Sequence, residues 1–397
     1  KNGKLNSPAN ILNRVIFEDF DEPTIDQIIS DIQIEPNNDE VLQDGDIKVG
    51  NQQTFSHKKL NSIKASLKNP NTHFKFVCRD VIRYALLNLD GETRLKLVSD
   101  QPIGDIKESP DSSLKALFQR DSDRMTVRQK VYDAFNKYLC IDPTNVGSLS
   151  LNLSDTEPAN HKIERGLDDD SITFHKNATP VSNFSDGAKA FIGVLIELIV
   201  GKPRILLFDE PEAFLHPPLA NKLGQEVSYL MLQSNKRVFV STHSSDFVMG
   251  CLQTGIPVNI VRLTYQNNIA TARLLSSADV LMFMKKPLLR SSGVFKSLFY
   301  EYVVVVEGDS DRAFYEEINN RLLQFEDNKG IPNCLFISSY GKQSEHSIIN
   351  SIRKLGIPVA GIVDVDILKD DGEWIKFLKG INIPPIEHTT LGATRSK

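Results

Sequence analysis

The chain has 397 residues, of which 40% are hydrophobic and 24% charged, a composition ordinary for a folded protein of about two domains. Its formal net charge of −5 gives no global basic signal for nucleic acid, and its four scattered cysteines include no CxxC pair that would indicate a zinc ribbon or disulfide framework. The longest strongly apolar helix, 191–200, is too short to span a bilayer and no signal peptide opens the chain, so we expect a cytoplasmic protein without a membrane partner.

The first 140 residues contain three local patterns. Residues 1–3, Lys-Asn-Gly, resemble the front half of a P-loop of the form GxNGxGK[ST], but residues 4–7 do not supply the Gly-Lys-Ser/Thr that should follow. Either the loop is absent, or this sequence lacks part of it. Apolar residues alternate on both sides of an Asp-Gly pair in 87–97, which predicts a β-hairpin. The charged segment 120–138 carries one apolar stripe and is predicted to be a helix.

An unbroken apolar run at 205–208 predicts a strand buried inside a parallel sheet. The run stops at two carboxylates, Asp209 and Glu210. Open α/β sheets place their ligands at the carboxyl ends of strands, so these acids sit where a metal and a phosphate are expected. Asp209 can hold Mg²⁺, and Glu210 can orient or deprotonate an attacking water. The plainer alternative is that both acids only solvate a strand end.

Two neighbouring patterns favour a site. The apolar run 238–240 predicts a second strand that ends in Ser-Thr-His-Ser, which brings His243 to the same edge of the sheet. Upstream, a Ser-Asp-Gly motif at 185–187 precedes the apolar helix predicted over 188–200. Ser185 or Asp186 can cap that helix, whose N-terminal amides can bind an anion.

These three motifs, in this order and spacing, resemble the ATPase head of the ABC class. Asp209 and Glu210 resemble the Walker B pair, and His243 resembles the switch histidine that senses the γ-phosphate. Ser185 and Gly187 resemble the signature loop, with Asp where most members have Gly between them. The resemblance implies ATP as cofactor, with these five residues around it. Because a signature loop completes the nucleotide site of a second head, it also implies a homodimer or a higher homo-oligomer.

The pattern loosens after the histidine. The segment 258–284 predicts two strands and a helix, and the basic stretch 285–293 that follows is the candidate domain boundary. Its Lys285, Lys286 and Arg290 are weak candidates for contacts to nucleic acid. The predicted domains are an ATPase domain at 1–290, with insertions, and a second domain at 291–397.

A second acidic strand end follows. The valine-rich run 302–306 predicts a buried strand that ends at Glu307, followed by a glycine turn and a helix with Asp311 in its first turn. The plainer alternative is that Asp311 serves only as a negative charge at the N-terminus of this helix. A later strand, 358–363, leads into Asp364 and Asp366, which strand periodicity places on the same side. Two carboxylates so close repel unless a cation lies between them, so a metal is the economical interpretation.

Glu-Gly-x-Ser-Asp followed by Asp-x-Asp resembles the Toprim domain, whose acids bind Mg²⁺ and support phosphodiester chemistry. Carried over by position, the implied metal ligands are Glu307, Asp311, Asp364 and Asp366. Lys342, after the intermediate strand, can contact a phosphate and is a further catalytic candidate, although a surface lysine is an equal alternative.

An ABC head followed by Toprim is the architecture of the OLD (overcoming lysogenisation defect) family. The resemblance implies an α/β protein with an ABC-type ATPase domain on a mixed sheet and a C-terminal Toprim domain with a Rossmann-like parallel sheet. It implies an ATP-regulated DNA endonuclease that uses Mg²⁺ or Mn²⁺ and acts in antiphage defence. The implied partners are DNA, further copies of the chain, and other defence components such as a retron reverse transcriptase and its nucleic acid.

Two other functions remain open. A DNA-binding ATPase of the RecF or SMC type, without nuclease activity, explains the head but not Glu307 with Asp364 and Asp366. A topoisomerase- or primase-like enzyme is the other alternative, but a topoisomerase needs a nucleophilic tyrosine in a separate cleavage domain, and no segment suggests one.

Overall fold

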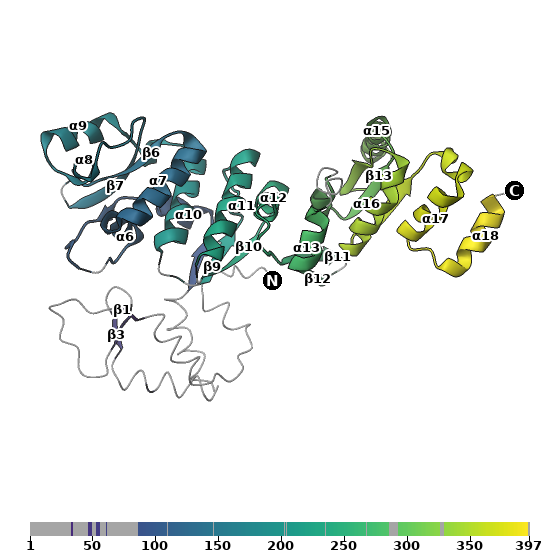
Figure 1. The fold of residues 1–397 in the computed structure, drawn as a ribbon, viewed down its shortest axis with the longest axis horizontal. Helices are drawn as coiled ribbons and strands as arrows, with labels where there is room; N and C mark the ends of the chain where they lie inside the picture. Colours follow the sequence, from purple (N-terminus) through teal and green to yellow (C-terminus); the bar gives the residue numbers. More distant parts are fainter. Residues whose placement is uncertain are drawn as a thin grey trace. The chain divides into compact units, whose positions relative to one another are not determined.

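The computed structural model describes residues 33–34, 47–49, 53–55, 61 and 86–395, with gaps at 109, 146, 202, 204, 235, 267, 286–292 and 326–328. Contacts divide the chain into two compact units, Lys1–Gly250 and Cys251–Lys397 (Figure 1). The domain limits expected from the sequence, at 290 and 291, stay a prediction. The segment that resembles the start of a P-loop lies outside the described residues.

A three-stranded parallel sheet carries the first acidic strand end. Its order is β10 (Arg237–Ser241), β9 (Ile205–Asp209) and β4 (Leu86–Leu89), so the strand with the two carboxylates is central. Leu206 and Phe208 of β9 are buried, as the unbroken apolar run predicts. The helices described in this unit are α5 (Gly91–Lys96), α6 (Ser113–Gln119), α7 (Asp121–Phe135), α8 (His161–Arg165), α9 (Asp169–Asn177), η1 (Val181–Asn183), α10 (Asp186–Val200) and α11 (Pro217–Leu232). Helix α10 is apolar and almost wholly buried, and it packs against α5, α6, α7 and α11.

The predicted hairpin at 87–97 is wrong. Strand β4 is followed by a helix, α5, and not by a returning strand. Asp90 is its N-cap: the Asp90 carboxylate accepts a hydrogen bond from the backbone N–H of Thr93, and the Thr93 hydroxyl accepts one from the backbone N–H of Asp90. This reciprocal capping box makes the Asp-Gly pair a helix start and not a turn. The apolar alternation did not distinguish the two.

Antiparallel strands form a second sheet in the same unit. Its members are β5 (Gln101–Pro102), β6 (Tyr138–Asp142), β7 (Ser148–Ser154) and β8 (Thr179–Pro180), and three further short strands, β1 (Gln33–Ile34), β2 (Ile47–Val49) and β3 (Gln53–Phe55), form another. The parallel and antiparallel strands together give the mixed α/β architecture expected of the head, although the described strands lie in separate sheets.

A buried ion network joins the helices beside the antiparallel sheet. The Glu164 carboxylate of α8 accepts hydrogen bonds from Arg124 Nε at 3.0 Å and from Arg128 Nη2 at 2.6 Å, both on α7. It also accepts one from the backbone N–H of Ile141 in β6. All three charged side chains are buried, and Arg124 also pairs with Asp121 at 2.6 Å. Helix α7 is the helix predicted over 120–138, ended by Asn136 in the left-handed conformation at φ 54°.

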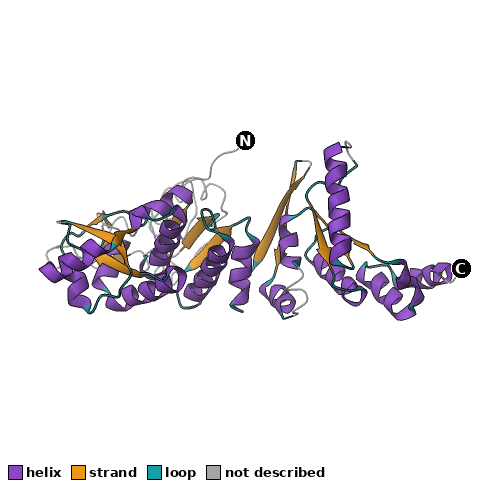
Figure 2. Ribbon diagram, turned by 90° about the horizontal axis from the view of Figure 1, so that it is seen from above, coloured by secondary structure: helices purple, strands orange, loops and turns teal. Residues whose placement is uncertain are grey.

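The second unit is built on a parallel sheet of order β14 (Cys334–Ser338), β13 (Tyr302–Val306) and β15 (Val359–Ile362), visible among the strands of Figure 2. Val304 packs with Tyr315 of helix α15 (Asp309–Phe325) on one face. Ile349 of helix α16 (Lys342–Lys354) lies against Gly361 on the other face, so helices cover both sides. The remaining elements are α12 (Ser245–Gln253), which contains the division between the units, the antiparallel pair β11 (Ile260–Gln266) and β12 (Ile269–Leu275), α13 (Ser277–Met284), η2 (Val294–Phe299), η3 (Val365–Lys369), α17 (Asp371–Gly380) and α18 (Pro385–Arg395).

Candidate functional sites

The carboxyl ends of β9 and β10 bring together three of the predicted residues. Asp209 Oδ1 accepts a hydrogen bond of 2.6 Å from the hydroxyl of Ser241, its register partner on β10. The backbone N–H of Glu210 donates to the Ser241 carbonyl at 2.8 Å. His243 Nε2 lies 3.8 Å from Glu210 Oε1, and these two side chains are 87% and 54% exposed. Both are therefore open to a ligand at this edge.

Arg94 supports this strand end from behind, and the sequence reasoning missed it. Its guanidinium is fully buried and donates to the carbonyl oxygens of Leu89 at 3.1 Å, Asp209 at 2.5 Å and Glu210 at 2.9 Å. Burial lowers the pKa of Arg94, while the nearby carboxylates, Glu212 first, act in the opposite direction. Glu210 has a φ of 47°, a left-handed conformation that is uncommon for a residue other than glycine. Arg94 holds the backbone that carries it.

Glu212 is a second residue that the sequence reasoning missed. Its Oε1 accepts hydrogen bonds from the Thr242 hydroxyl at 2.8 Å and from the backbone N–H of His243 at 3.0 Å. Glu212 therefore links the segment after β9 to the loop that carries the histidine.

The Ser-Asp-Gly motif begins helix α10. Ser185 is its N-cap, with the Ser185 hydroxyl oxygen accepting from the backbone N–H of Ala188 at 3.3 Å. A Cβ added to Gly187 would lie 2.5 Å from the carbonyl oxygen of Phe214, so only glycine fits this close approach. The capping role is as predicted. The nucleotide-binding roles of Ser185 and Gly187 stay predictions.

The second acidic group is compact. Glu307, Asp364 and Asp366 each offer a carboxylate oxygen, and these atoms lie within 4.8 Å of one another. The reason differs from the one expected, because Asp364 and Asp366 do not lie on a strand. Strand β15 ends at Ile362, Asp364 caps η3, and Asp366 lies within η3. A 3₁₀ turn, not strand periodicity, brings the two aspartates together.

The residues of this cluster fit a hard divalent cation. Carboxylate oxygens are the ligands that Mg²⁺ prefers, and three like charges in so small a space repel without a counter-charge. Glu307 Oε2 is buried and finds no hydrogen-bond partner among the described residues. A bound cation would satisfy that oxygen.

A fourth carboxylate lies nearby on α16. Glu345 is fully buried, and neither of its oxygens has a hydrogen-bond partner within the described part of the chain. Burial, followed by the charges of Glu307 and Asp364, raises the pKa of Glu345 to about 8. The sequence reasoning missed Glu345, although a signal existed. It occupies the first position of the series 345, 348, 349, 352, whose other members are buried isoleucines.

Asp311, a further predicted ligand, is not one of the three residues of the cluster. Asp311 Oδ2 accepts a hydrogen bond of 3.0 Å from the backbone N–H of Gly308, at the start of α15. This is the local helix-start role that the sequence left open for it. Lys342 is the first residue of α16, and its side chain lies outside the described part of the structure. Their parts in metal or phosphate binding stay predictions.

The loop after β14 anchors the backbone of Glu307. The backbone N–H of Gly341 donates to the Glu307 carbonyl at 3.1 Å, and that of Ser339 donates to the Val306 carbonyl at 2.8 Å. Gly341 has a φ of 123°, which favours glycine at this position. The acidic strand end is thus fixed by its neighbour in the sheet.

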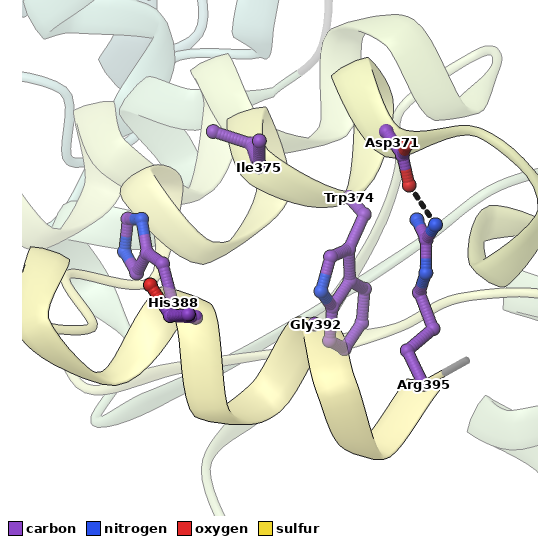
Figure 3. Close-up of a pocket in the computed structure, with 7 residues that line it drawn as sticks. Asp371, Trp374, Ile375, His388, Gly392 and Arg395 are labelled. Carbon is purple, nitrogen blue, oxygen red and sulfur yellow. Dashed lines mark ion pairs between the residues drawn. The ribbon is translucent and has the colours of Figure 1, made fainter. Parts of the chain in front are cut away.

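A pocket of about 300 Å³ lies between α17 and α18 (Figure 3). An ion pair between Asp371 and Arg395 closes one side, and Trp374 and His388 line it. It contains none of the predicted site residues.

Comparison with known families divides the chain in the predicted order. Residues 6–250 match the family described as "AAA domain, putative AbiEii toxin, Type IV TA system". Residues 298–366 match "Overcoming lysogenization defect protein-like, TOPRIM domain". The predicted ATPase head followed by a Toprim domain is confirmed by these two matches. No curated protein matches the chain.

Among solved structures, the chain is similar to a Smc head bound to the C-winged helix domain of ScpA, with 13% identity and a TM-score of 0.35, over 51% of this chain and 61% of that chain. It is also similar to a structure from work on ATP-driven dimerisation of SMC ATPases, with 13% identity and a TM-score of 0.28, over 42% and 92%. It is also similar to a Smc head with an extended coiled coil from Pyrococcus furiosus, with 11% identity and a TM-score of 0.30, over 58% of this chain and 45% of that chain. The chain thus spans about three fifths of the first of these and under half of the third. Within the described residues, no helix has the length and apolar character needed to cross a membrane.

Proposed function

Because the chain belongs to this AAA-domain family and carries an OLD-like Toprim domain, we propose that it is an ATP-regulated, divalent-metal-dependent DNA endonuclease of the OLD type. The observation that carries the proposal is the cluster of Glu307, Asp364 and Asp366, with oxygens within 4.8 Å of one another, at strand ends of the Toprim-matching segment. A DNA-binding ATPase without nuclease activity has no use for such a cluster.

At the nuclease site, Glu307, Asp364 and Asp366 would hold Mg²⁺ or Mn²⁺. When bound, the cation supplies charge neutralisation and a more acidic water for phosphodiester hydrolysis. Asp364 is exposed while Glu307 and Asp366 are half-buried, so the cluster opens toward solvent on its Asp364 side. DNA would approach from that side. Lys342 would contact a DNA phosphate, and Asp311 would assist from the start of α15.

At the ATPase site, Asp209 would hold Mg²⁺, Glu210 would serve as the base, and His243 would sense the γ-phosphate. The exposure of Glu210 and His243 supports this assignment, because both can meet a nucleotide. Ser185 and Gly187 would contact the ATP of a second head, so the working form is a homodimer or larger homo-oligomer. The site requires the Gly-Lys-Ser/Thr of a complete P-loop.

The proposed biological setting rests on the family resemblance alone. An OLD-type nuclease in the cytoplasm would act in antiphage defence, with DNA and other defence components as partners. The chain's acidity, −5 overall, means that DNA recognition would rest on local basic residues and on the cations.

Cleavage of a supercoiled plasmid in Mg²⁺ or Mn²⁺ tests the nuclease. The double variant Asp364→Ala/Asp366→Ala should abolish cleavage and leave ATP hydrolysis within about twofold of wild type, since the two acidic groups lie on different sheets. The matched control is Glu316→Ala/Glu317→Ala, which removes two carboxylates that pair with Arg312 and Arg321 on α15. It should cut at the wild-type rate. Cleavage by the aspartate variant at that rate would exclude this site.

A further inference from the structure

Glu345 is buried in a way that packing alone does not explain. It is fully inaccessible, and the next residues on its helix face, Ile348, Ile349 and Ile352, are buried too. A leucine or isoleucine would complete that stripe, whereas a carboxylate without a hydrogen-bond partner is costly in such surroundings. Neither Glu345 oxygen finds one among the described residues. Among the described residues, therefore, no side chain satisfies this carboxylate.

The carboxylate of Glu345 faces the strand that leads to the acidic cluster. A Cβ added to Gly361 would lie 2.9 Å from Glu345 Oε1, so the carboxylate occupies the space that a side chain at this position would fill. Gly361 pairs in register with Val305 of β13. Two residues beyond Val305 is Glu307, and three beyond Gly361 is Asp364. Glu345 thus lies beneath the strand ends that carry the cluster.

The charges of the cluster reach this carboxylate. Burial first, and then the charges of Glu307 and Asp364, raise the pKa of Glu345. Glu345 is not one of the three residues whose oxygens lie within 4.8 Å of one another. Its position is therefore that of a group behind the ligands rather than among them.

We propose that Glu345 is a positioning residue of the cation site, a fourth carboxylate that acts behind Glu307 and Asp364 on a divalent cation and the water it carries. The inference rests on the proposed function, because it assigns the cluster to a divalent cation. Carboxylates behind metal ligands orient them and strengthen binding, and their loss typically weakens metal affinity by about 10–100-fold.

Mn²⁺ binding to the full chain provides the test, measured by calorimetry and by the electron paramagnetic resonance signal of free Mn²⁺ without DNA or ATP. In Glu345→Gln, which keeps the shape and removes the charge, affinity at this site should fall by about 10–100-fold. Thermal unfolding of the metal-free variant should occur at or above the wild-type temperature, because a buried carboxylate without a partner has been removed. A purely structural glutamate would give the opposite pair of results.

Two control variants lie on the helices beside this sheet, α16 and α15. Ile352→Val loosens α16 by one buried methyl group without touching the acids, and Glu317→Gln removes an exposed charge on α15; both should bind Mn²⁺ as wild type does. If Glu345→Gln folds poorly, Glu345→Met fills a similar volume without polar atoms and should show the same loss. Wild-type affinity in a folded Glu345 variant would overturn the inference. Absence of Mn²⁺ binding at the cluster in wild type itself, judged by no change in Asp364→Ala/Asp366→Ala, would instead overturn the proposed function.

Discussion

At the scale of single residues, the carboxyl edge of the parallel sheet in the first unit depends on one guanidinium. Arg94 donates to three carbonyl oxygens, those of Leu89, Asp209 and Glu210, which lie at the ends of β4 and β9. Arginine suits this task because its planar fork presents several donors at once, which the single ammonium of lysine does not. Glu210 adopts its left-handed backbone in direct contact with this side chain.

Replacing Arg94 should therefore damage both stability and activity. Arg94→Met removes the guanidinium that donates to three carbonyl oxygens, and we expect the free energy of unfolding to fall by about 3 kcal/mol. Arg94→Lys should recover part of that loss. Urea denaturation of both variants, with ATP turnover measured below the transition, checks this. An Arg94→Met variant as stable as wild type would mean that water replaces the guanidinium.

Individual site residues were predictable where they directly follow a strand that the sequence predicts. Asp209, Glu210 and Glu307 each follow an unbroken apolar run, so their positions follow from sheet geometry. Arg94 and Glu345 were not predictable in the same way, because each is an ionisable side chain that is buried in the fold. Arg94 falls in the second arm of a predicted hairpin that does not form, and Glu345 follows no strand end.

At the scale of elements, two buried carboxylates, those of Glu164 and Glu345, differ in how the cost of burying them is offset. Glu164 joins α8 to Arg124 and Arg128 of α7 and to the backbone of β6, and each of its oxygens has a partner. Glu345 of α16 has no partner among the described residues. The first arrangement is a structural connection between helices and a sheet. The second is consistent with a site completed by a ligand.

Removing the charge of Glu164 should loosen the packing of α7 against α8. In Glu164→Gln, two buried guanidinium groups lose their shared carboxylate, and we expect a loss of about 3 kcal/mol in the free energy of unfolding. Chemical denaturation followed by circular dichroism measures it. Glu157→Gln, an exposed carboxylate in the same unit, is the control and should change stability by less than about 0.5 kcal/mol. Equal stabilities for the two variants would show that the network is energetically neutral.

At the scale of elements, periodicity predicted several strands and helices around both sites, including β9, β10, β13 and α10. It failed where local hydrogen bonding decides the outcome. The Asp90–Thr93 capping box turned an alternating segment into α5, and a 3₁₀ turn replaced the end of the strand expected before Asp364. The pattern of apolar residues does not report hydrogen bonds between a side chain and a backbone group three residues away.

At the scale of the whole molecule, the two acidic groups belong to different compact units and different sheets. We therefore expect that substitutions in one acidic group leave the other group intact. In a protein with a complete P-loop, Glu210→Gln should slow ATP hydrolysis by about 10²–10⁴-fold, because the base is lost while Asp209 remains. Mn²⁺ binding at Glu307, Asp364 and Asp366 should stay within about twofold of wild type.

The same variant tests assembly. With ATP bound and not hydrolysed, the proposed exchange of signature loops between heads should persist, so light scattering should report a mass of at least twice that of one chain. A variant that remains a single chain in saturating ATP would contradict the shared site, and unchanged turnover would remove Glu210 from its role as base.

The strand order of the second unit also matters while the protein is being made. Central strand β13 leaves the ribosome first, yet both of its neighbours, β14 and β15, are encoded after it. Its valine-rich run from Val303 to Val306 must wait for residues up to 362, which takes on the order of several seconds of translation. During that interval both edges of the strand are open to other nascent chains. Any chain interrupted before residue 359 keeps one of those edges, so an unfinished copy is an aggregation hazard to its own polysome.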